Sequence, residues 1–195
     1  MKTPEARQSL QGSLSINDLV FMEQTHSDVV KVIESGGAQP IADALITTVP
    51  GVAIAVLVAD CIPLLLSNEN VVAAVHVGRK GVLNKIARKT VEAMKVLGAG
   101  KISAVIGPSI CGKCYEVSPE MYEEITKEVP ASATTKDLHA LDLKAALIDQ
   151  LTHLSVEVKD MQLCTLCSAT ESGKSDYFSY RGGDDFARGA GVICL

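Results

Sequence analysis

The fold is decided by an unbroken apolar run, Val52-Ala53-Ile54-Ala55-Val56-Leu57-Val58-Ala59. Apolar residues without polar alternation are typical of a strand that is covered on both faces. The dipeptide Pro50-Gly51 marks a turn before the run. Asp60 and Pro63 interrupt its continuation, so the stretch is too short to cross a bilayer of about 30 Å as a helix. We therefore expect a buried strand at the centre of a sheet.

Composition bounds the class of protein. The chain has 195 residues, of which 47% are hydrophobic and 21% charged, so we expect one domain spanning residues 1–195 with a substantial core. The net charge is −5 and no run of five Lys or Arg residues occurs, which argues against a nucleic acid or a membrane as partner. Residues 1–17 carry no apolar leader, so we expect a cytoplasmic protein whose six cysteines are free thiols or metal thiolates.

Local patterns predict strands and helices in mixed order. Apolar positions at helical spacing predict one long helix from Val82 to Leu97, ended by Gly98. A helix over 141–151 is expected to be capped near Asp142. No regular βαβ rhythm is present, so the predicted class is α+β or mixed α/β. The other expected elements are a short N-terminal helix, strands at 19–22, 29–33 and 43–48, a hairpin of 63–66 with 71–77, a strand at 102–106, a helix at 120–128, and strands at 156–163 and 189–195.

Three potential metal ligands stand at the ends of predicted strands: His26, Cys61 and His76. Two imidazoles and a thiolate suit Zn²⁺, and three protein ligands leave the fourth tetrahedral position open, as in catalytic zinc sites. Copper is chemically allowed as well. Taken singly, each residue also has a structural explanation, because buried cysteines and hydrogen-bonded histidines are common without a metal.

Two CxxC pairs offer a second set of thiols, Cys111 with Cys114 and Cys164 with Cys167. Together they could form a Cys₄ zinc site. However, the 49 residues between Cys114 and Cys164 far exceed the gap of a compact zinc ribbon. Neither pair has the sequence surroundings that depress a thiol pKa, so a redox role is expected even less.

Cationic residues mark candidate anion sites. Arg79 and Lys80 open the predicted long helix directly after His76, where backbone N–H groups and two positive charges would favour a phosphate. A solvated first turn with no ligand explains the same residues. The loop around Arg181 can likewise line a pocket or form an ordinary turn.

Several segments in order along the chain resemble one family, the multicopper polyphenol oxidase (laccase-like) domain family. Its members are described as zinc-dependent purine nucleoside phosphorylases, with adenosine deaminase and methylthioadenosine phosphorylase activities attributed to the same site. The segments that carry the resemblance are QTHSDV (24–29), DALIT (43–47), ADCIPLLL (59–66), AVHVG (74–78), IGPSI (106–110) with CYEV (114–117), and CT (164–165) followed by FSYR (178–181).

The resemblance implies a layered α/β/β/α sandwich with mixed sheets. It implies that His26, Cys61 and His76 bind the metal and that Asp60 and Cys61 serve catalysis. A purine nucleoside and phosphate are the implied partners, and a homo-oligomer is left open. The implied substrate or phosphate contacts are Gln24, Arg79, Lys80, Cys114 and Arg181.

The sequence also departs from the family pattern. Arg79-Lys80 stands where the family has Trp-Arg, and Gly182-Gly183 follows Arg181 where another Arg is usual. The family's N-terminal Ser-Thr-Arg-x-Gly-Gly hairpin has no counterpart here, so we expect part of the substrate pocket to be missing or supplied by another subunit.

Two rival functions remain open at this level. A catalytically degenerate protein would keep the zinc triad without turnover. A copper-dependent phenol oxidase would need several histidine-rich copper sites, whereas this chain has four histidines in all. Of these, His139 and His153 are expected to be surface or packing residues.

Overall fold

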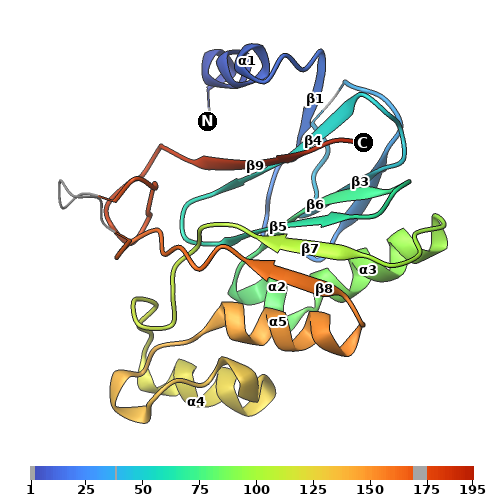
Figure 1. Cartoon of the computed structure of the whole chain (residues 1–195). Helices are drawn as coiled ribbons and strands as arrows, with labels where there is room; N and C mark the ends of the chain where they lie inside the picture. Colours follow the sequence, from blue (N-terminus) through green and yellow to red (C-terminus); the bar gives the residue numbers. More distant parts are fainter. Residues whose placement is uncertain (1–2, 38, 169–174) are drawn as a thin grey trace.

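The computed structural model describes residues 3–37, 39–168 and 175–195. Its strands form two sheets (Figure 1). The larger sheet has the order β2-β3-β6-β5-β7-β8, and the smaller has the order β1-β4-β9. The strands of the larger sheet are β2 (Val30–Ile33), β3 (Ala44–Thr47), β5 (Ile62–Ser67), β6 (Val72–Val77), β7 (Ser103–Ile106) and β8 (Glu157–Asp160), and those of the smaller are β1 (Asp18–Phe21), β4 (Val52–Val58) and β9 (Gly189–Ile193).

Both sheets are mixed. In the larger sheet, β2 pairs with β3 and β7 with β8 in parallel, whereas the pairs between β3, β6, β5 and β7 are antiparallel. In the smaller sheet, β4 pairs in parallel with β1 and antiparallel with β9. The predicted hairpin is therefore the pair β5 and β6, joined by a turn at residues 68–71.

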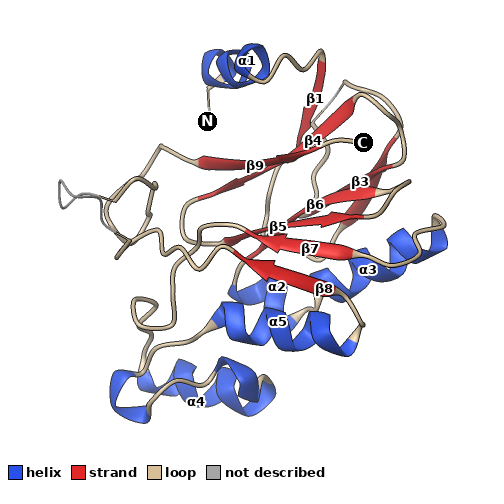
Figure 2. Cartoon of the chain, in the orientation of Figure 1, coloured by secondary structure: helices blue, strands red, loops and turns tan. Residues whose placement is uncertain are grey.

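Helices pack on the outer face of the larger sheet, and the smaller sheet covers its inner face (Figure 2). One apolar core lies between the larger sheet and the helices, and a second lies between the two sheets. The helix α1, which precedes β1, has no buried residue and contributes no side chain to either core. The helices are α1 (Pro4–Ser13), α2 (Arg79–Leu83), α3 (Ile86–Val96), α4 (Pro119–Glu128) and α5 (Leu143–His153), with short 3₁₀ turns at η1 (Pro130–Ser132) and η2 (Lys136–Leu138).

The predicted α+β class is confirmed, and the apolar run at 52–59 is the middle strand of the smaller sheet. Six of the seven residues of β4 are buried, because one face packs on the larger sheet and both edges are paired. The Asp142 cap is also confirmed: its carboxylate accepts a hydrogen bond of 2.9 Å from the backbone N–H of Ala145. No helix in the described part of the chain is long and apolar enough to cross a membrane.

The long helix predicted from Val82 to Leu97 is wrong in one respect, because it is broken into α2 and α3. Lys85, between them, has φ 60 and ψ 42, which is the left-handed region. A residue in that conformation cannot continue a right-handed helix. The C-terminal end lies where the sequence predicts it, since Gly98 takes φ 93 and the N–H of Ala99 bonds to the carbonyl of Met94.

Candidate functional site

The three predicted ligands converge from different parts of the fold. His26 lies in the loop between β1 and β2, Cys61 lies between β4 and β5, and His76 lies near the end of β6. One potential ligand atom from each residue lies within 4.8 Å of the other two. Cys61 Sγ is 3.9 Å from His26 Nε2, and the two imidazole rings meet edge to face with centroids 4.7 Å apart.

A fourth residue, Asp43, holds two of these ligands. Its fully buried carboxylate lies 2.7 Å from Nδ1 of His76, and it accepts hydrogen bonds from the backbone N–H groups of Thr25, His26 and Ser27. His26 bends around this carboxylate with a left-handed φ of 58. Because Nδ1 of His76 is engaged, Nε2 is the nitrogen left for a metal. Asp43 begins the DALIT segment, but no pattern in the sequence marks it as a partner of the ligands.

Hydrogen bonds within the group shift the pKa values of Asp43, Cys61 and His76 toward their charged forms. Burial by itself would raise the pKa of Asp43, but hydrogen bonds from His76 and Ser27 hold that pKa well below its usual range. Burial likewise opposes ionisation of Cys61 and His76. Hydrogen bonds with the two histidines nevertheless lower the pKa of Cys61 to about 6, and those with Asp43 and Cys61 raise the pKa of His76 to about 9. The lowered pKa of Cys61 favours the thiolate, the form that binds metals.

The spacing of the donors fits a zinc ion. Zn–S and Zn–N bonds of about 2.3 and 2.1 Å at tetrahedral angles separate the two donor atoms by about 3.6 Å, close to the 3.9 Å between Cys61 and His26. Gly78 packs directly against the group: a Cβ there would lie 3.0 Å from Cys61 Sγ and 3.2 Å from His26 Cδ2. A larger residue at this position would displace both ligands.

The ligand group forms part of the wall of a pocket of about 600 Å³. Gln24 also lines it, but its amide is engaged by the backbone of β4, with hydrogen bonds of 2.7 and 2.8 Å to the carbonyl and N–H of Leu57. Two aromatic side chains, Tyr115 and Tyr180, line the same pocket, and the sequence alone predicts no role for either. The wall of the pocket therefore combines potential metal ligands, two aromatic rings and charged side chains, among them Arg7, Glu23 and Arg188.

Asp60, next to Cys61, organises the loops around the pocket. The residue is mostly buried and has a left-handed φ of 81. Its carboxylate accepts hydrogen bonds of 2.6 Å from the Thr165 hydroxyl, 2.7 Å from the Ser179 hydroxyl and 2.7 Å from the backbone N–H of Arg181. Thr165 and Ser179 lie in the CT and FSYR segments, but nothing in those segments predicts this contact. These three hydrogen bonds tie Asp60 to two distant segments of the chain, which is how a positioning residue acts.

The candidate anion contacts are only partly brought together. Arg181 lines the 600 Å³ pocket and, with Arg79, a neighbouring open pocket of about 540 Å³. The Arg181 guanidinium lies over the Tyr115 ring, 5.0 Å from its centroid. Lys80 is exposed and lines neither pocket. The helix that follows Gly78 has only five residues, so the two arginines, rather than a long helix, supply positive charge here.

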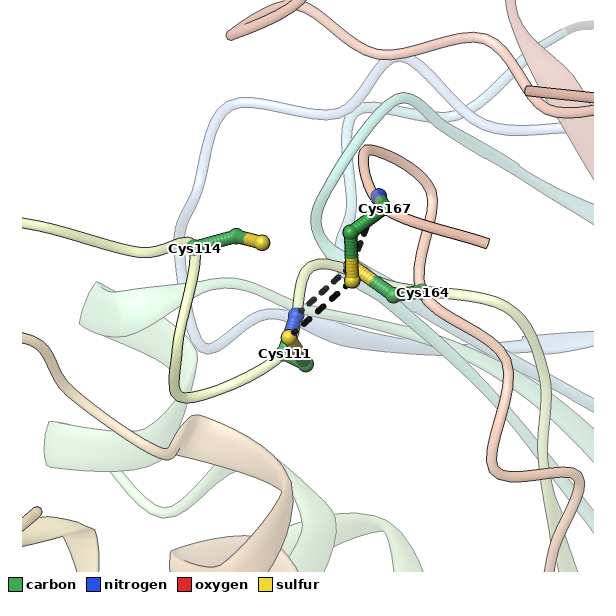
Figure 3. A group of neighbouring side chains, drawn as sticks. All are labelled: Cys111, Cys114, Cys164 and Cys167. Carbon is green, nitrogen blue, oxygen red and sulfur yellow. Dashed lines mark hydrogen bonds between the residues drawn. The ribbon is translucent and has the colours of Figure 1, made fainter. Parts of the chain in front are cut away.

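The remaining predicted residues lie elsewhere. Cys114 lines neither pocket and instead joins Cys111, Cys164 and Cys167 in a cluster of four thiols (Figure 3). The two CxxC pairs therefore lie together in the fold, although 49 residues separate Cys114 from Cys164 along the chain. His139 packs edge-on against Tyr122, and His153 lies at the end of α5, so in the described part of the chain only two histidines share a potential metal group. This arrangement does not provide the several histidine-rich sites of a multicopper oxidase.

Comparisons with known proteins agree with these features. A family model described as multi-copper polyphenol oxidoreductase laccase matches residues 2–195. A purine nucleoside phosphorylase of Corynebacterium glutamicum is 42% identical over 193 residues, which span 93% of this chain and 76% of that protein. An adenosine deaminase from an unknown prokaryotic organism is 34% identical over 186 residues, spanning 83% of this chain and 71% of that protein.

A crystal structure of a Neisseria meningitidis protein superimposes with a TM-score of 0.82 at 28% identity, covering 99% of this chain and 82% of the other. On the match over nearly its whole length, the chain belongs to the multi-copper polyphenol oxidoreductase laccase family.

Proposed function

We propose that this protein is a zinc-dependent purine nucleoside phosphorylase, which cleaves adenosine or inosine with phosphate to the free base and ribose 1-phosphate. The observation that carries the proposal is the convergence of His26, Cys61 and His76 on the wall of a pocket large enough for a small ligand. The names of several relatives, including the one from Corynebacterium glutamicum, support the substrate class.

In the proposed reaction a phosphate oxygen forms a bond to the anomeric carbon of the ribose, and the bond from that carbon to the purine nitrogen breaks. Positive charge develops on the sugar, and an adjacent phosphate stabilises it. Arg181 and Arg79, which line one open pocket, are the residues that would hold the phosphate. When bound to the His26, Cys61 and His76 group, Zn²⁺ would supply a Lewis acid beside the substrate.

The other residues of the pocket would bind and orient the nucleoside. Tyr115 and Tyr180 offer aromatic faces for the base. Asp60 acts through its neighbours, because its carboxylate fixes the backbone of Arg181 and the side chains of Thr165 and Ser179. Asp43 would keep His76 oriented toward the metal.

The test is release of purine base from adenosine and inosine by the purified, zinc-loaded protein, with and without phosphate. Phosphate-dependent release that a chelator abolishes is the expected result. The His26→Ala variant should lose most of this activity, whereas His139→Ala, outside both pockets, is the matched control. Absence of release from a folded, zinc-loaded protein would contradict the proposal and favour a catalytically degenerate zinc protein.

Adenosine deamination is a second candidate activity, favoured by the relative named as an adenosine deaminase. In that reaction water would replace the amino group of the purine, giving inosine and ammonia without any need for phosphate. The same adenosine assay separates the two activities, because inosine accumulates in phosphate-free buffer only if deamination occurs. Its absence there would remove this candidate while leaving phosphorolysis intact.

A further inference from the structure

Four cysteines lie together outside the pocket of the proposed active site. Cys111 and Cys114 come from the segment after β7, and Cys164 and Cys167 come from the segment after β8. Each sulfur lies within 4.8 Å of the other three. Figure 3 shows the sulfurs of Cys111, Cys164 and Cys167 gathered closely and that of Cys114 directed toward them from the other side.

Sheet topology explains why these pairs meet. The strands β7 and β8 are parallel neighbours, so their carboxyl ends reach the same edge of the sheet. Beyond the strands the two segments stay hydrogen-bonded: Ser109 donates to the carbonyl of Leu163, and Thr165 donates to the carbonyl of Ser109, both at 3.2 Å. The two CxxC turns are thus aligned by the backbone, independently of any contact between the thiols.

The separation of the sulfurs matches a mononuclear metal site. In a tetrahedral site with Zn–S bonds of about 2.3 Å, neighbouring sulfurs lie about 3.8 Å apart. The sulfurs of Cys111 and Cys167 are 3.8 Å apart. A disulfide would require about 2.05 Å. Two disulfides would also bring sulfurs together only in pairs, whereas here all four are mutual neighbours.

Backbone N–H groups point at one of these sulfurs. Cys164 Sγ accepts three such contacts, from Cys111 at 3.3 Å, from Leu166 at 3.4 Å and from Cys167 at 3.5 Å. Donors aimed at sulfur stabilise a thiolate and orient it as a ligand. Cys164 is buried, but Cys167 is exposed, so an ion can reach the cluster from solvent.

We propose that Cys111, Cys114, Cys164 and Cys167 bind one zinc ion as a closed tetrathiolate site, separate from the His26, Cys61 and His76 group. Four sulfur ligands fill the tetrahedral shell and leave no position for substrate, so the site is structural. Binding releases the protons of those thiols that are still protonated, and the metal takes up no electrons.

The ion would fix the wall of the neighbouring pocket. The two CxxC turns carry or adjoin residues that reach Asp60: the Ile110 N–H donates to its carbonyl at 2.9 Å, and the Thr165 hydroxyl donates to its carboxylate at 2.6 Å. Tyr115, which lines the pocket, directly follows Cys114. A metal joining the turns therefore ties together the chain segments on which the position of Asp60 depends.

Metal content measured in a Cys61→Ala background tests this site without the other. Elemental analysis of that variant should find one zinc ion per chain. Adding Cys167→Ser should abolish the bound zinc and lower the melting temperature, whereas adding Cys194→Ser should change neither, because Cys194 is exposed and outside the cluster. An absence of zinc from folded Cys61→Ala protein, or iron in its place, would overturn the proposal.

Two further measurements keep the proposal testable if the double variant does not fold. Cobalt exchanged into the Cys61→Ala protein should give the intense thiolate-to-metal bands of a tetrahedral sulfur site. Intact mass under non-reducing, metal-free conditions should equal that of the fully reduced chain. A mass lower by two hydrogens per bridge in freshly purified protein would show that the cysteines are disulfides and would overturn the assignment. Neither result depends on turnover of a nucleoside.

Discussion

Asp43 and His76 form a buried hydrogen-bonded pair, with 2.7 Å between Oδ1 of the carboxylate and Nδ1 of the imidazole. They come from neighbouring antiparallel strands, since β3 begins directly after Asp43 and His76 lies in β6. The backbone N–H of His76 also donates to the Asp43 carbonyl at 2.8 Å. One residue thereby fixes both the position and the ring orientation of a potential metal ligand.

Replacing this carboxylate should weaken metal binding. Asp43→Asn keeps the shape of the side chain but removes the charge that orients His76, so zinc affinity of the His26, Cys61 and His76 group should fall by about 10–100-fold. Competition with a chromophoric chelator measures this in protein whose Cys₄ cluster carries Cys167→Ser. Asp28→Asn is the matched control, because Asp28 is an exposed partner of Lys89. Equal affinities of the two variants would contradict the role given to Asp43.

The same carboxylate should make stability sensitive to acid. The pKa of Asp43 in the folded protein lies below its ordinary value of 3.8, so its contribution to the free energy of unfolding is present above about pH 4 and is lost as the pH falls. In metal-free protein, urea unfolding between about pH 2 and pH 4 should show a smaller decline in stability for Asp43→Asn than for the native chain. An equal decline in the two proteins would show that the pKa of Asp43 is not lowered on folding.

Asp60 should contribute to the stability of the loops that it joins. Asn tolerates the left-handed backbone at this position, so Asp60→Asn tests the charge rather than the conformation. Three donors face this carboxylate, and hydrogen bonds to charged groups contribute about 1.5–3 kcal/mol each, so we expect a loss on the order of 3 kcal/mol in urea unfolding. The exposed Asp185→Asn variant is the control and should stay within about 0.5 kcal/mol of the native chain. A loss of that small size for Asp60→Asn would refute the positioning role.

Arg79 and Lys80 should differ in their effect on KM for phosphate. If the proposed function holds, Arg79→Ala should raise KM for phosphate about tenfold, equivalent to about 1.4 kcal/mol of binding, because Arg79 and Arg181 line the same pocket. Lys80→Ala should leave KM unchanged within about twofold, since its exposed side chain lines neither pocket. Initial rates at varied phosphate decide this, and a larger effect at Lys80 than at Arg79 would place the anion elsewhere.

Features that depend on neighbours along the chain can be predicted from the amino-acid sequence. The apolar run at 52–59, the hairpin of β5 and β6 and the cap at Asp142 follow from hydrophobic pattern and capping chemistry. The resemblance drawn from short motifs also identified the family and proposed His26, Cys61 and His76 as ligands, which the fold brings together.

Contacts between residues far apart along the chain depend instead on how the elements pack. The two CxxC pairs converge because β7 and β8 are parallel neighbours, a pairing that no spacing of cysteines encodes. The contacts of Asp60 with Thr165 and Ser179, and of Asp43 with His76, likewise join segments that share no local pattern. The break at Lys85 depends on one residue in a left-handed conformation. Periodicity reports the face that a residue presents, whereas these contacts depend on how the sheets and loops pack against one another.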